Sequence, residues 1–86
     1  MYAKEVVVTN THGLHARPAA NLVKFCSKFS CKLTITGGRA PVNPKNIFSM
    51  MSAAIKPGTT VTVIGEGDGE TEAVDAICAF IAEMKD

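Results

Sequence analysis

The sequence predicts an α+β fold, a two-layer open-faced β-sandwich in which three helices cover one face of a sheet and solvent covers the other. Two observations lead to this prediction. Four short segments have the alternation or β-branched content of strands, and three longer segments space apolar residues by three and four. Their order along the chain is strand, helix, strand, strand, helix, strand, helix. Because each helix carries one apolar stripe, all three are expected on the same face of the sheet.

Four segments are predicted as strands: residues 2–9, 31–36, 39–43 and 60–66. In the second, Cys31, Leu33 and Ile35 alternate with polar residues, and Gly37-Gly38 then allows a tight hairpin turn. Pro41 has no N–H to give to a ladder, so residues 39–43 are expected as a short edge strand. The outward polar side chains, mostly threonines, fit an open sheet face.

Three segments are predicted as helices: residues 16–28, 46–54 and 70–84. The first carries an apolar stripe of Ala19, Leu22, Val23 and Cys26, and the last a stripe of Val74, Ile77, Cys78 and Ile81. Asp68 or Gly69 is expected to cap the last helix, with Glu70 and Glu72 in its first turn, where the helix dipole favours acidic side chains.

Length and charge limit the classes of function. The 86 residues are expected to form one domain, 1–86, with room for a core but not for a deep substrate cavity as well. A net charge of +1 argues against a general nucleic-acid binder and against a polybasic membrane anchor.

The run Val6–Val8 is too short for a signal-peptide core, and no stretch approaches the ~18–20 apolar residues of a membrane span. Three cysteines without an export signal indicate reduced thiols and a cytoplasmic protein.

The segment 11–20 is the one that carries chemistry. Pro18 is tolerated in a helix only within the first turn, which places His15 at or beside the N-cap, and Gly13 permits the sharp change of direction before it. The amides of Ala16 and Arg17 then have no intrahelical acceptors. The helix dipole disfavours a protonated ring there and welcomes an anion, so a neutral imidazole could take a phosphoryl group onto a ready-made anion site. The guanidinium of Arg17 would clamp the phosphate oxygens.

A plain structural role for this histidine competes with that hypothesis. Histidine occurs at helix caps and in turns, and an arginine two residues later is common. The combination with Gly13 and Pro18, together with the lack of another candidate site, favours the nucleophile.

The run Gly-Leu-His-Ala-Arg-Pro-Ala at 13–19, placed after a first strand, strongly resembles the HPr family of histidine-containing phosphocarriers. The resemblance extends over essentially the whole chain, including Val42-Asn43, the helix from Lys45 to Ser52 and the Pro57-Gly58 turn. It implies an antiparallel sheet of four strands in the order 1-4-2-3. It also implies a bacterial protein of the phosphoenolpyruvate-dependent sugar phosphotransferase system.

The resemblance further implies that His15 carries the phosphoryl group on Nδ1 and that Arg17 stabilises it. The group would arrive from phosphorylated enzyme I and leave to the A components of sugar permeases. The chain would be a carrier and not an enzyme, without a cofactor, and is expected to be a monomer.

The segment 46–54 carries apolar residues over roughly 220° of a helix, more than a helix lying on a sheet can bury. Met50, Ala53 and Ala54 are expected to face inward. From the residues alone, an exposed patch of Ile47, Phe48 and Met51 and a plain core helix are equally good interpretations. The resemblance favours the patch as a partner-binding surface, together with Ala20 and Lys24.

Two positions depart from the family. Asn46 stands where many relatives carry a regulatory serine, so no regulatory phosphoserine is expected. Ser49 and Ser52 lie within the helix and are poor substitutes for that serine as phosphorylation sites. His12 stands where the family usually has a small polar residue. It could cap the helix, add a donor near the phosphate or be a plain loop residue, and the last role is favoured.

Other functions remain as alternatives. A zinc site of His12, His15, Cys26 and Cys31 is unfavourable, since Cys26 lies ~16 Å along the helix from His15, and no metal is expected. A regulatory binding module with an unmodified His15 is another alternative. An autonomous enzyme is a third, although no carboxylate pair, nucleotide loop or metal cluster supports it.

Overall fold

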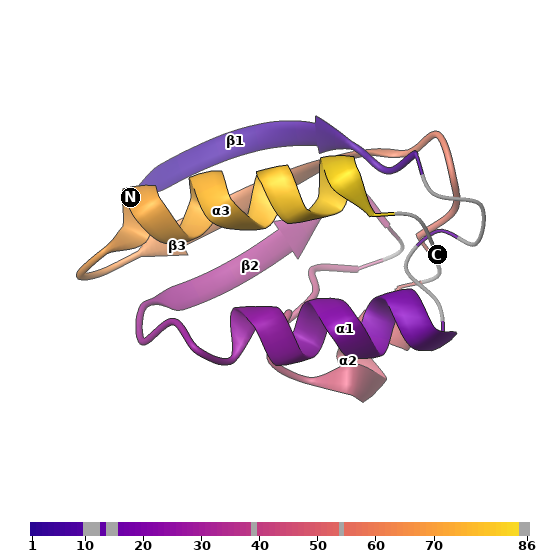
Figure 1. Cartoon of the computed structure of the whole chain (residues 1–86), viewed down its shortest axis with the longest axis horizontal. Helices are drawn as coiled ribbons and strands as arrows, with labels where there is room; N and C mark the ends of the chain where they lie inside the picture. The colour runs from indigo at the N-terminus through magenta and orange to yellow at the C-terminus, as the bar shows by residue number, and fades with distance from the viewer. Residues whose placement is uncertain (10–12, 14–15, 39, 54, 85–86) are drawn as a thin grey trace.

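Six elements follow one another in the computed structural model, which describes residues 1–9, 13, 16–38, 40–53 and 55–84 (Figure 1). They are β1 (Tyr2–Val7), α1 (Ala16–Cys26), β2 (Lys32–Thr36), α2 (Ile47–Ser52), β3 (Thr60–Glu66) and α3 (Glu70–Glu83). Each lies within a segment that the sequence predicts. The predicted ends differ by a few residues, as they do where helices and strands fray.

The three strands form one antiparallel sheet in the order β1-β3-β2. β3 is the central strand: Val63 pairs with Lys4 on one side and with Ile35 on the other. Side chains alternate as predicted. Val61, Val63, Leu33 and Ile35 are buried, whereas Thr34, Thr36 and Thr62 lie half-buried on the other face.

The predicted fourth strand, residues 39–43, is not formed in the described part of the chain. The order 1-4-2-3 therefore reduces to three strands and a single bridge, in which Ile35 and Val42 exchange two backbone hydrogen bonds of 3.0 and 2.8 Å. The bridge stands beside β2, where the fourth strand was expected. Pro41 removes the donor on one side of Val42, as predicted.

A turn explains why pairing stops after Val42. The N–H of Asn46 donates to the carbonyl of Asn43 at 3.0 Å, which closes a four-residue turn with Pro44 at its second position, where proline is favoured. The side chain of Asn43 accepts from the N–H of Lys45 at 3.0 Å. The chain thus leaves the sheet directly after Val42.

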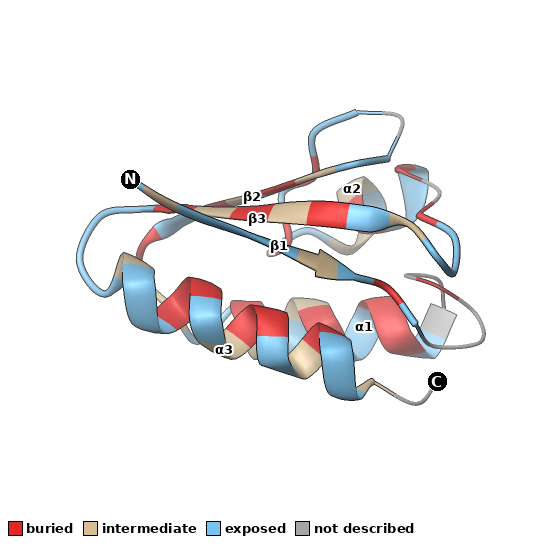
Figure 2. Cartoon of the chain, turned by 90° about the horizontal axis from the view of Figure 1, so that it is seen from above, coloured by how far each residue is buried: buried red, intermediate tan, exposed pale blue. Residues whose placement is uncertain are grey.

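Helices α1 and α3 lie on one side of the sheet, and α2 packs beside α1 at the margin of the sheet (Figures 1 and 2). The core fills the space between the two layers. It includes residues of the predicted stripes, namely Ala19, Leu22, Cys26, Val74, Ile77, Cys78 and Ile81. The opposite sheet face carries no helix in the described residues (Figure 2).

The predicted helix caps agree with the structure. Gly69 precedes α3 in the left-handed region with φ of 77°, and Glu70 and Glu72 lie in the first turn. Asn46 caps α2. None of the helices in these described ranges is long and apolar enough to cross a membrane.

Candidate functional site

The loop between β1 and α1 holds the predicted site, and the structure describes Val8, Thr9 and Gly13 of it. The predicted nucleophile His15, and His12 beside it, lie outside the described residues. Gly13 is buried with φ of 64°. A Cβ built on it would lie 2.4 Å from the carbonyl oxygen of Ile55 and 3.1 Å from the backbone of Lys56. Gly13 is therefore held against the segment that leads into β3.

The backbone on the other side of His15 follows the prediction. α1 begins at Ala16, the residue after His15, and Pro18 lies buried in its first turn. That turn contains no acidic side chain. No carboxylate within this first turn offsets the positive end of the helix dipole, which favours binding of an anion in front of the helix.

Arg17 is exposed, and no ion pair or side-chain hydrogen bond joins it to another described residue. Its guanidinium is accessible to a ligand on this side of the helix. Ala20 and Lys24, at successive turns of α1, are exposed as well. The predicted partner-binding residues of α1 therefore continue from the start of the helix along its solvent side.

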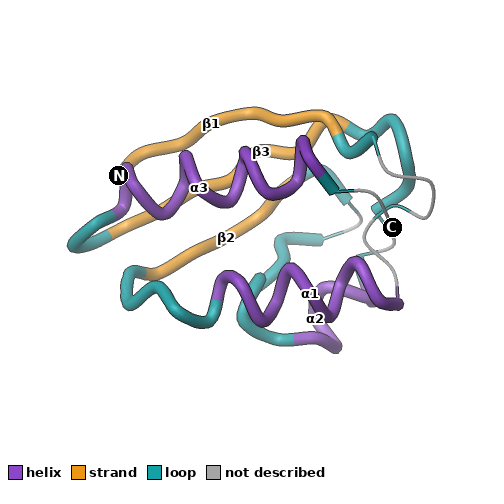
Figure 3. The backbone as a smooth tube through the Cα atoms, viewed as in Figure 1, coloured by secondary structure: helices purple, strands orange, loops and turns teal. Residues whose placement is uncertain are grey.

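The predicted patch on α2 is exposed in part. Phe48 is 79% exposed and Met51 43% exposed, one turn apart. Ile47 is half-buried and packs against the core, so it contributes less to this surface than the sequence suggested. Met50 and Ala53 face inward as expected, and Ala54 lies outside the described residues. α2 lies next to α1 (Figure 3).

Asn46 acts as a helix cap. Its side-chain oxygen accepts from the N–H groups of Phe48 and Ser49 at 2.9 and 3.1 Å. Ser49 is half-buried, and its hydroxyl accepts from the N–H of Asn43 at 2.9 Å, whereas Ser52 is exposed.

The cysteines have the environment of small apolar residues. Cys26, Cys31 and Cys78 are free and buried. Burial raises the pKa of Cys26 to about 12, although nearby Lys45 acts in the opposite direction. Burial also raises the pKa of Cys78. Among the described residues, no cluster of three metal-ligating side chains is present.

Two features of the structure could not be predicted from the sequence. One is the contact of Gly13 with Ile55 and Lys56, for which the neighbouring Pro57-Gly58 turn is only a weak signal. The other is a groove of about 490 Å³ between α1 and α3, lined by Asn21, Lys24, Phe25, Lys28 and Phe80. Its floor is a stack of Phe25 on Phe80 with ring centroids 4.5 Å apart, and Lys28 lies 4.2 Å from the Phe25 ring centre.

Comparison with known proteins identifies the family. A family model described as the PTS HPr component phosphorylation site matches residues 2–83. Phosphocarrier protein HPr of Haemophilus influenzae is 35% identical over 85 residues, covering 99% of this chain and all of the relative. HPr-like protein Crh of Halalkalibacterium halodurans is 43% identical over 81 residues, covering 94% and 96%.

Comparison with solved structures identifies the same family. A crystal structure of phosphocarrier protein HPr from Bacillus anthracis superposes with a TM-score of 0.87 at 37% identity, over 92% of this chain and 94% of that one. The resemblance that the segment 13–19 suggested is confirmed. The chain belongs to the HPr family of the phosphotransferase system, in which the proteins named HPr are phosphocarriers and not enzymes.

Proposed function

We infer that this chain accepts a phosphoryl group on Nδ1 of His15 from phosphorylated enzyme I and passes it to the A components of sugar permeases. The junction between loop and helix carries this proposal. Gly13 is fixed against Ile55, α1 begins directly after His15, and Arg17 is free of ion pairs within the described chain. Family membership supports a phosphocarrier role in the same system.

The proposed chemistry consists of two phosphoryl transfers, one from enzyme I to His15 and one from His15 to an acceptor. In the first, the lone pair of the neutral ring attacks phosphorus, a new N–P bond forms, and the bond from phosphorus to the donor nitrogen of enzyme I breaks. In the second, an acceptor group attacks the same phosphorus and His15 leaves with its electron pair restored. Helix amides and the Arg17 guanidinium stabilise the charge on the phosphoryl oxygens in both directions.

The exposed residues of α1 and α2 suit the docking that this relay needs. Phe48 and Met51 offer adaptable apolar contacts on α2, and the exposed Arg17 and Lys24 add positive charge on α1. A carrier must release each partner after transfer, so we expect a small interface and a monomeric, cytoplasmic protein in the free state.

The test is incubation of the purified chain with phosphoenolpyruvate and enzyme I. We expect one phosphate per chain, labile in acid and stable in base, which is absent in His15→Ala. His12→Ala is the matched control, since it removes the other histidine and should keep the label. A label that survives acid, or that persists in His15→Ala, would overturn the proposal.

A Crh-like regulatory role is the second candidate, because a Crh protein is among the relatives at 43% identity. In that case partners would bind the exposed patch without modification of His15. The presence of His15 in the sequence and the asparagine at position 46 favour the carrier. The same labelling experiment separates the two, since a purely regulatory protein would take no phosphate from enzyme I.

A further inference from the structure

The turn after Val42 leaves an unoccupied position in the sheet, beside β2. Continuing the register of the Ile35–Val42 bridge would set residue 44 opposite Leu33. The turn of residues 43–46 instead carries the chain away, and Pro44 has no N–H to offer. The rung that a fourth strand would form with Leu33 is missing.

The main-chain groups of Leu33 point into this position. In an antiparallel sheet, alternate residues direct both N–H and C=O to the same side. Ile35 uses both groups to bind Val42, so those of Leu33, two residues earlier, face the same outer edge of β2. No backbone hydrogen bond from the described residues reaches them. Leu33 thus presents one donor and one acceptor, the arrangement that an extended peptide satisfies.

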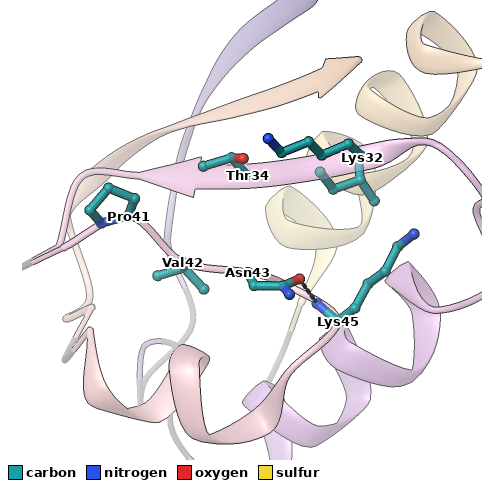
Figure 4. Close-up of a pocket in the computed structure, with 7 residues that line it drawn as sticks. Lys32, Thr34, Pro41, Val42, Asn43 and Lys45 are labelled. Atoms are coloured by element: carbon teal, nitrogen blue, oxygen red, sulfur yellow. Dashed lines mark hydrogen bonds between the residues drawn. The ribbon is translucent and has the colours of Figure 1, made fainter. Parts of the chain in front are cut away.

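The position is open and positively charged. A pocket of about 420 Å³ lies between Lys32–Thr34 and the diverging segment Pro41–Lys45 (Figure 4). Lys32 is exposed, and Lys45 donates to the carbonyl of Cys31 at 2.9 Å at the end of the pocket.

Neither of these two lysines forms an ion pair with another described residue. The ion pairs of the described chain join Met1 to Glu70 and Lys4 to Asp75. The nearest acidic residue by register is Glu66, opposite Lys32 on β3. Two ammonium groups against one carboxylate leave the pocket with a net attraction for anions.

We propose that this edge of β2 binds an extended acidic segment of a partner chain, which takes the place of the missing fourth strand. One residue of that segment exchanges two backbone hydrogen bonds with Leu33. The residue after it lies opposite Lys32 and projects onto the open sheet face, so a glutamate or aspartate there meets the lysine. The proposal does not depend on phosphoryl transfer at His15.

The experiment is an NMR titration of the ¹⁵N-labelled chain with the peptide acetyl-Glu-Val-Glu-Val-Glu-amide. We expect saturable shifts centred on the Leu33 amide, and slower hydrogen exchange of that amide in the complex. Before peptide is added, the Leu33 amide should exchange faster than the Ile35 amide, which is bonded to Val42. The Lys32→Gln variant should bind about twofold to fivefold more weakly, as expected for one exposed ion pair.

Three controls make the result decisive. Lys56→Gln removes an exposed lysine outside the pocket and should leave the peptide affinity unchanged. The basic peptide acetyl-Lys-Val-Lys-Val-Lys-amide should not shift Leu33, and neither should inorganic phosphate at the same concentration. No saturable shift at Leu33, or an equal response to the basic peptide or to phosphate, would overturn the proposal.

Discussion

At the scale of single residues, Gly13 links the backbone of the fold to the chemistry of the candidate site. The sequence shows why a glycine suits a sharp change of direction, but not that the backbone of Ile55 and Lys56 lies within contact distance of it. Two constraints meet at this position, a left-handed φ of 64° and a close approach of another backbone. Either alone would favour glycine, and together they leave no room for a side chain.

Replacing Gly13 by alanine is therefore expected to destabilise the protein by about 2–4 kcal/mol, from the left-handed backbone and the displacement of Ile55. Gly58→Ala is the matched control, because Gly58 has φ of 87° but nothing within 4 Å of a built Cβ. It should cost only about 1 kcal/mol. Urea unfolding of both variants measures the difference, and equal losses would show that the contact with Ile55 is unimportant.

The other informative residue is Asn46, whose side chain receives two N–H groups of α2. Asn46→Ala should destabilise the protein by about 1 kcal/mol, the usual cost of losing such a cap. Asn46→Ser should lie within a few tenths of a kcal/mol of the natural chain, because serine caps equally well. Thermal or urea unfolding checks both values. A serine variant as unstable as the alanine one would contradict the capping role.

At the scale of elements, the sequence predicts the six elements well because their signals are local. Apolar spacing in 16–26 and 70–83 and alternation in 32–36 are each visible in a short window. The predicted fourth strand failed because two prolines and an asparagine turn outweigh the preference of its other residues. The contact of Phe25 with Phe80 could not be predicted, since it depends on how α1 and α3 pack.

The exposed side of α2 allows a test of the docking surface. Phe48 is mostly exposed, so Phe48→Ala should change the free energy of unfolding by less than about 0.5 kcal/mol. If the residue contacts enzyme I, the dissociation constant should rise about fivefold to tenfold. Ile47→Ala provides the contrast, because Ile47 packs on the core and its truncation should mainly reduce stability. Unchanged affinity of Phe48→Ala for enzyme I would remove this residue from the interface.

At the scale of the whole molecule, the core between the sheet and the helices accounts for the stability more than surface charge does. Tyr2 donates to Asp75 at 2.9 Å and Lys4 lies 3.5 Å from the same carboxylate, which joins β1 to α3. These contacts are exposed, and exposed pairs contribute little to the free energy of unfolding. Cys26, in contrast, is fully buried in the main core cluster. Its ionisation is therefore coupled to unfolding of the whole protein.

This coupling predicts a loss of stability at alkaline pH. The Cys26 thiol has a pKa of about 12 in the folded protein because burial disfavours the thiolate, against a usual value of 9.0 that applies once the chain unfolds. Below pH 9.0 the thiol is protonated in both states, and its contribution to stability is fully present. As pH rises towards 12, only the unfolded state loses the proton, so stability falls by at most about 1.4 kcal/mol per pH unit. Urea unfolding at pH 8, 10 and 11 measures the decline, and Cys26→Ala should flatten it. An equal slope in the variant would show that other groups cause the alkaline loss.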